Sequence, residues 1–162
     1  LQIKKYGSCS SSAKGKVLGA GYEPYIMAFF IGLYSNKKLQ LSEFSEDLKV
    51  LGQPIDKWGN LDSKKFRHAY AGLRSYIFIA LVAKTEIDWI ALDKGDIKVN
   101  SVVTSLIETM EEYANYGFSV MEDKLKTDPS YFYSHRSFLD IFLQLTNKPS
   151  ATLTGDEEPE DL

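Results

Sequence analysis

The residues of this chain that could perform chemistry are few, and none falls into a pattern that defines a site. His68 and His135 are the only histidines, and they lie on different predicted helices. No H-x-x-x-H, E-x-x-H or Cys/His cluster accompanies them, so zinc and di-iron sites lack ligands at the usual spacing. We therefore predict no metal and no other cofactor.

Two further patterns could suggest an enzyme. The glycine-rich stretch GKVLGAG (15–21) has a valine where a Walker loop needs Ser or Thr, and its glycines miss the dinucleotide spacing. Glu108, Glu111 and Glu112 could pair as catalytic carboxylates, but their spacing is more typical of the solvated face of a helix. No nucleophile-elbow sequence supports a Ser–His–Asp triad. We predict a non-enzymatic protein.

Charge is distributed unevenly along the chain. Residues 1–84 hold 13 Lys/Arg and 6 Asp/Glu, whereas residues 85–162 hold 6 and 16, which gives net charges of +7 and −10. The overall net charge of −3 therefore conceals two opposed halves. Opposed halves favour self-association, because the basic half of one molecule attracts the acidic half of another.

A basic cluster stands at the start of a predicted long helix. The candidate anion-binding residues are Lys57, Lys64, Lys65, Arg67, His68 and Arg74. The helix macrodipole disfavours cations in a first turn, so such a cluster could serve to bind phosphate. The partner would be DNA or an acidic protein. The plainer alternative is a solvated face that neutralises acidic residues of the same or a neighbouring molecule.

Two other classes of function remain open. A small ligand-binding or enzyme domain would place its pocket among aromatic side chains, for which the candidates are Tyr22, Tyr25, Trp58 and Trp89. A purely oligomeric structural module would stack its opposed charge halves head to tail. A deep pocket with convergent carboxylates favours the first class, and a flat surface with a basic stripe favours an adaptor.

The elements that must position these residues are helical. Apolar residues recur at three- and four-residue spacing over most of the chain, which predicts an all-α, single-domain bundle of five or six helices. The expected helices are 22–34, 43–51, 63–84, 88–94, 101–126 and 129–146, with 22–34 central because it is apolar nearly all round. Residues 1–21 should form an extended or short-strand segment, 22–149 the helical domain, and 150–162 an acidic tail.

Gly117 interrupts the apolar stripe of the helix predicted over 101–126. The stripe runs through Val103, Leu106, Met110, Tyr113, Gly117 and Met121. Glycine destabilises a helix by about 1 kcal/mol relative to alanine, so something should offset it. We predict a close helix crossing there. The alternative is a kink near residues 115–117.

The longest apolar runs, 25–34 and 76–83, are too short to span a bilayer, which needs about 18 residues. The single cysteine, Cys9, cannot form an internal disulfide. Together these features predict a cytoplasmic protein without a membrane segment.

Two stretches carry a family resemblance. EPYIMAFFIGLYSNKKLQL (23–41) and TMEEYANYGFSVMEDKL (109–125) resemble small bacterial proteins found beside DNA phosphorothioation and related anti-phage gene clusters. The shared features are Ile31-Gly32-Leu33-Tyr34 followed by lysines, and Glu112-Tyr113-Ala114-Asn115-Tyr116-Gly117-Phe118. The resemblance covers residues 22–125 and implies a cytoplasmic, mainly helical accessory protein of DNA modification or defence, without chemistry of its own.

Overall fold

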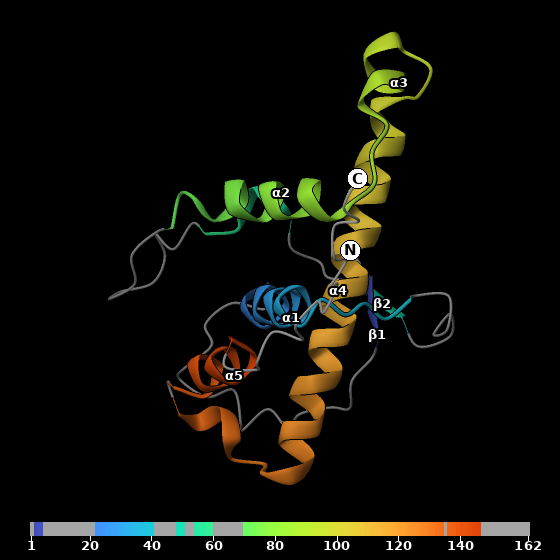
Figure 1. The fold of residues 1–162 in the computed structure, drawn as a ribbon. Helices are drawn as coiled ribbons and strands as arrows, with labels where there is room; N and C mark the ends of the chain where they lie inside the picture. Colours follow the sequence, from blue (N-terminus) through green and yellow to red (C-terminus); the bar gives the residue numbers. More distant parts are fainter. Residues whose placement is uncertain are drawn as a thin grey trace, which may run out of the picture.

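The computed structural model of the chain describes residues 2–4, 22–40, 48–50, 54–59, 70–134 and 136–146 (Figure 1). Within them the fold is all-α with a small β-ribbon, which confirms the predicted fold class. The helices are α1 (Tyr22–Ser35), α2 (Leu73–Lys84), α3 (Trp89–Lys94), α4 (Val99–Thr127) and α5 (Ser137–Thr146). The shorter elements are β1 (Gln2–Lys4), β2 (Leu48–Val50) and the 3₁₀ turns η3 (Ile55–Lys57) and η4 (Tyr131–Tyr133).

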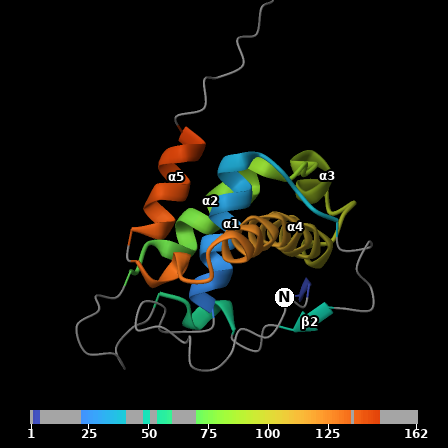
Figure 2. The same ribbon diagram turned by 90° about the horizontal axis from the view of Figure 1, so that it is seen from below.

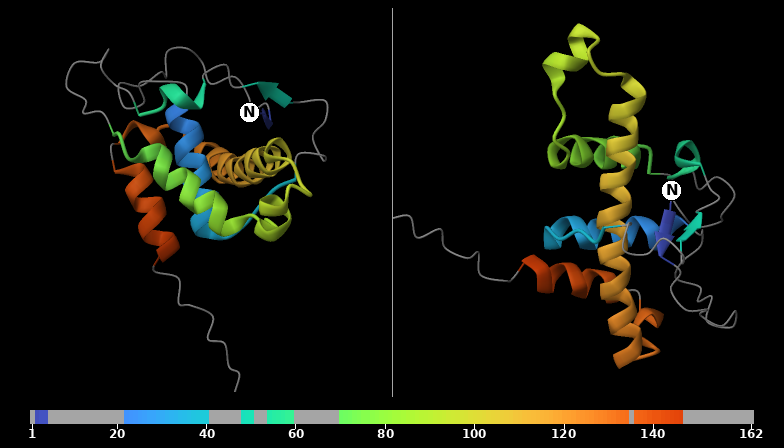
Figure 3. Two further views of the ribbon diagram at one scale, coloured as in Figure 1. Left: turned by 90° about the horizontal axis from the view of Figure 1, so that it is seen from above. Right: turned by 90° about the vertical axis from the view of Figure 1, so that its right-hand side faces the viewer.

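The 29-residue helix α4 is the axis of the molecule. At 1.5 Å per residue it is about 43 Å long. Helices α2, α1 and α5 follow one another along it, and α3 lies beside its N-terminal end (Figures 1 and 3). Figures 1 and 2 show α1 lying against α4, with α2 and α5 along the flanks of α1.

The crossing of α1 and α4 is close enough to need two glycines. A Cβ on Gly117 would overlap the carbonyl of Ala28 and stand 2.7 Å from the Cα of that residue. A Cβ on Gly32 would likewise overlap the carbonyl of Tyr113, 2.8 Å from its carbon. Helix α4 continues without a break through Gly117. A close crossing, and not a kink, therefore accounts for this glycine.

Two apolar clusters share α1. The larger one joins α1 and α4 to α2 and to Trp58, which follows η3. The smaller one lies under α5, where Phe138 and Ile141 pack against Ile31 of α1 and Met121 of α4. Because α1 contributes to both clusters, the structure confirms its predicted central place.

The helix predicted over 43–51 is wrong at its C-terminal end. Leu48–Val50 is the strand β2, which pairs antiparallel with β1 in the register Gln2↔Val50, Ile3↔Lys49 and Lys4↔Leu48. The short strand expected near the N-terminus is present as β1. Local propensity missed β2 because a three-residue strand forms only when a distant partner supplies its hydrogen bonds.

The long helix predicted over 63–84 begins at Leu73, ten residues late. Residues 70–72 form a turn, because the Tyr70 amide donates to the Gly59 carbonyl (3.0 Å) and ties the chain to the loop after η3. Residues 63–69 lie outside the described part of the chain, as do residues 5–21 and the acidic tail 150–162.

The helix predicted over 129–146 is divided into η4 and α5. Asp128 Oδ1 accepts hydrogen bonds from the amide (2.8 Å) and hydroxyl (2.6 Å) of Ser130, which holds a tight turn. These bonds also lower the pKa of the Asp128 carboxyl. Ser137 then starts α5, and its hydroxyl lies against the carbonyls of Tyr131 and Ser134. The start signal Asp128-Pro129 is therefore followed by the single 3₁₀ turn η4, and α5 begins only at Ser137.

The remaining helices match their predicted ranges to within two residues. Asp88 caps α3 through a hydrogen bond from the Ala91 amide to Oδ1 (2.8 Å). Gly95 ends α3 in the left-handed conformation, with φ +80°, which only glycine adopts without strain.

Two tyrosine hydroxyls in the larger cluster, those of Tyr22 and Tyr25, are buried without a hydrogen-bond partner among the described residues. The side chain of Tyr25 is 1% exposed. Burial, with a smaller contribution from the charge of Glu111, raises the pKa of the Tyr25 phenol well above its usual range. The neutral phenol is therefore favoured in the folded state, although its hydroxyl hydrogen bond is lost on folding.

We predict that Gly117→Ala destabilises the protein by about 3 kcal/mol or more, because the new methyl group must push two helix backbones apart. Urea unfolding followed by circular dichroism measures this change. Gly72→Ala is the matched control, since its Cβ would meet only the flexible ring of Tyr76, at 3.2 Å. Equal stability of the two variants would contradict the close crossing.

We predict that Tyr25→Phe raises the free energy of unfolding by about 1 kcal/mol at neutral pH, because it removes a buried, unpaired hydroxyl. The variant should also lose less stability in alkali. In the parent protein a raised folded pKa means that the stability from Tyr25 is full below its ordinary pKa of 10.0 and declines as pH rises toward the folded value.

Tyr34→Phe is the control for this substitution, because Tyr34 is 60% exposed. It should change neither the stability at neutral pH nor its alkaline slope. Chemical denaturation of both variants across the alkaline range makes the comparison. A Tyr25→Phe variant less stable than the parent would show that its hydroxyl is hydrogen-bonded.

Candidate functional site: an apolar groove

Three of the four aromatic residues expected to line a pocket lie together in the core. The rings of Tyr22 and Trp58 stack with centroids 5.7 Å apart, and Tyr25 meets Trp58 at 5.6 Å. All three side chains are buried, so they fill space between the helices. Trp89 is elsewhere, half-exposed on α3.

The structure brings two of the expected anion-binding residues together. Lys57 Nζ lies 3.4 Å from the Asp56 carboxylate, and Arg74 donates to the Asp56 carbonyl at 3.3 Å. Both cations are exposed, and the Asp56 carboxylate partly neutralises Lys57. Lys64, Lys65, Arg67 and His68 lie outside the described residues. Since α2 begins at Leu73, these four do not form its first turn.

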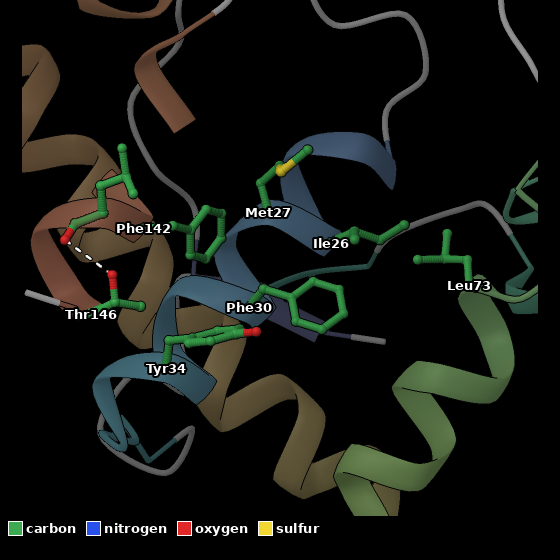
Figure 4. Close-up of a pocket in the computed structure, with 8 residues that line it drawn as sticks. Ile26, Met27, Phe30, Tyr34, Leu73, Phe142 and Thr146 are labelled. Carbon is green, nitrogen blue, oxygen red and sulfur yellow. Dashed lines mark hydrogen bonds between the residues drawn. The ribbon is translucent and has the colours of Figure 1, made fainter. Parts of the chain in front are cut away.

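An apolar groove lies on the face of α1 that points away from α4 (Figure 4). Its volume is about 420 Å³. The lining comes from α1, from the start of α2 and from α5: Ile26, Met27, Phe30, Tyr34, Leu73, Phe142, Leu143 and Thr146. The groove therefore has its floor on one helix and its walls on two others.

The floor exists because α1 is apolar on both sides. Its inner residues, such as Ala28 and Phe29, are buried under α4 and neighbouring helices. Met27, Phe30 and Tyr34 recur at three- and four-residue spacing on the outer side, where a surface helix usually carries polar residues. Met27 and Phe30 are only half-buried, so the outer face of α1 lacks a full cover.

Helix α5 forms one wall of the groove. Phe142 packs edge-to-face on Tyr34, with ring centroids 5.5 Å apart. Leu143 is 49% exposed at the groove surface. The Thr146 hydroxyl donates to the Leu143 carbonyl (3.1 Å), so it is satisfied within its own helix (Figure 4). The wall consequently presents mainly carbon to an incoming ligand.

Cations stand beside both ends of the groove. Arg74 follows the groove residue Leu73, next to Lys57. Near the other end, Lys84 Nζ donates to Asn36 Oδ1 (2.9 Å), two residues beyond Tyr34. All of these charged groups are exposed, so each can meet a partner without first being drawn out of the protein.

The lining of the groove carries few reactive groups. Among its lining residues, the only titratable group is the phenol of Tyr34, and there is no carboxylate, histidine, cysteine or lysine. Within the described ranges, no three His, Cys, Asp or Glu side chains gather at a spacing that could hold a metal ion. Among those same ranges, no helix is both long and apolar enough to span a bilayer.

Sequence reasoning missed the groove, although one signal for it was visible. It treated the all-round apolar character of α1 as a sign of complete burial, whereas α2 and α5 cover only the flanks of the helix. The same error hid the exposed residues Phe78 and Ile79 of α2. Apolar residues in excess of one buried stripe were the available signal.

Comparison of this chain with protein-family models, with curated proteins and with solved structures finds no match. The site must therefore be interpreted from its own geometry.

Proposed function

We propose that this protein is a non-enzymatic adaptor that binds an acidic, amphipathic helical segment of a partner protein in the groove between α1, α2 and α5. The observation that carries the proposal is the uncovered apolar face of α1, with cations at both ends. The proposal further assigns the adaptor to a bacterial DNA-modification or defence system, which is what the sequence resemblance implies.

The apolar part of the groove supports a helical partner. Amphipathic helices place side chains from three- and four-residue spacings into hydrophobic grooves of this kind. Met27, Phe30 and Leu143 offer flexible or aromatic surface to such side chains. Each apolar residue that the partner buries would contribute about 1.5 to 3 kcal/mol before the losses of association are subtracted.

The charge around the groove supports an acidic partner. In the described residues 22–40, 54–59 and 70–84 the net charge is +3, from five basic and two acidic residues. The basic residues are Lys37, Lys38, Lys57, Arg74 and Lys84, and the acidic ones are Glu23 and Asp56. Lys37 and Lys38 lie over Tyr116 and Tyr113 of α4, and Lys38 pairs with Glu112, so the cations on the side of the groove are Lys57, Arg74 and Lys84. Complementary charge would speed association and orient the partner. A protein partner is favoured over DNA, because DNA interfaces are polar, wet and much more basic.

The proposal predicts that a labelled helical peptide of about 18 residues, five turns with Leu on one face and Glu on the other, binds with micromolar affinity. Fluorescence anisotropy measures the affinity. Leu143→Lys should weaken binding at least tenfold, because it removes apolar contact from the groove wall, and a loss in spite of the added positive charge would show that this apolar contact dominates. Tyr133→Lys is the matched control, since Tyr133 is also exposed but lies at the end of η4, outside the lining of the groove.

Two further probes decide between classes of partner. The same peptide with Lys in place of Glu should bind much more weakly, and a DNA duplex should not compete for the groove. Equal affinity for the acidic and basic peptides would overturn the role of charge. Tight binding of the duplex, lost between about 50 and 200 mM salt and unaffected by Leu143→Lys, would replace the protein partner with DNA.

A further inference from the structure

A second uncovered apolar surface lies at the far end of α4. The N-terminal turns of α4 and the short helix α3 extend beyond α2 as a tip (Figures 1 and 3). We define the tip as residues 85–108. Its exposed apolar side chains are Trp89, Ile90, Val99 and Val103, of which Ile90 is 68% exposed. An exposed Trp beside an exposed Ile is typical of residues that dominate binding interfaces.

The tip is acidic, unlike the surroundings of the groove. Its net charge is −3, from five acidic and two basic residues. The acidic residues are Glu86, Asp88, Asp93, Asp96 and Glu108, and the basic ones are Lys94 and Lys98. Among the described residues, the acidic tip and the groove, with Arg74 and Lys84 beside it, thus have opposite charges, and each has an apolar patch.

The tip cannot reach the groove of its own chain. Helix α4 is continuous from Val99 to Thr127, and it carries the tip at one end and the floor helix α1 further along. Helix α2 lies between α3 and α1 in both views of the long axis (Figures 1 and 3). Because α4 holds the tip and the groove apart, the groove of one molecule can bind only the tip of another molecule.

From this complementarity we infer that the groove binds the tip of a second copy of this chain, with Trp89 and Ile90 on the apolar floor and the acidic residues of the tip beside Arg74 and Lys84. The inference rests on the proposed function, because it uses the same groove. It adds that a second copy of the chain and the partner protein compete for the groove. The contact is small, so the affinity should be in the micromolar range typical of transient interfaces.

Sedimentation equilibrium over a range of concentrations tests the inference. The chain should progress from 18.3 kDa toward twice that mass or more as concentration rises. Added salt should weaken the association, because the complementary charges are exposed. Trp89 provides a second signal: its emission should shift to the blue on association, while the buried Trp58 stays constant. A chain that remains at monomer mass at about 100 μM, well above the expected micromolar affinity, overturns the inference.

Two variants test whether the tip and the groove form the contact between two copies of the chain. Ile90→Lys disables the tip, and Leu143→Lys disables the groove; each should be monomeric, with circular dichroism verifying its fold. Mixed together, they should form a one-to-one heterodimer, because the intact tip of one fits the intact groove of the other. Tyr133→Lys should associate like the parent. A mixture that stays monomeric, or single variants that still associate, would show that tip and groove do not bind each other.

The same variants separate this inference from the proposed function. Ile90→Lys keeps its groove, so it should bind the acidic peptide at least as tightly as the parent does. If it binds the peptide but the parent never associates, the self-association is wrong and the adaptor function stands. If the parent associates but no variant binds the peptide, the adaptor function is wrong and the groove serves self-association alone.

Discussion

The close crossing of α1 and α4 is the constraint on which the rest of the structure depends. Gly32 of α1 faces the backbone of Tyr113, and Gly117 of α4 faces the backbone of Ala28. Each helix therefore has one glycine that leaves room for the backbone of the other. Backbones that approach this closely bury the inner face of α1 completely against α4. Helices α2 and α5 then find room only at its flanks, and both apolar clusters form around the same crossing. The outer face of α1, with its groove, is the side that this arrangement leaves uncovered.

Much of this framework could be predicted from sequence, because it depends on local periodicity. The spacing of Met110, Tyr113 and Gly117 placed the glycine on the buried side of a helix, and the structure puts a neighbouring backbone there. The predictions failed where the local structure depends on contacts with residues distant in the sequence. Strand β2 depends on β1, and the late start of α2 depends on the hydrogen bond from Tyr70 to Gly59. Neither partner can be identified from the local pattern.

The groove was harder to predict than the fold for a related physical reason. A helix that is apolar all round has no marked face, so its sequence does not say which side its neighbours will cover. Met27 and Phe29 look equivalent in the sequence, yet one lines an open groove and the other lies in the core. Charge was more informative, since the opposed halves of the chain reappear as a basic groove region and an acidic tip. Even so, Lys57 and Arg74 are joined through Asp56, a contact that no charge count shows.

The outer face of α1 also bears on why the groove exists at all. The close approach of α1 and α4 uses the face of α1 that carries Ala28 and Gly32, so it does not itself require apolar residues at positions 27, 30 and 34. Exposed apolar area instead favours association, and a chain gains from it only when something covers it. The tip presents the same excess of apolar residues at Trp89 and Ile90, with the opposite charge. Since α4 holds both surfaces at a fixed separation, neither surface can cover the other within the same molecule. Each is therefore available either to a partner or to another copy, and the concentration of the chain sets the balance between the two.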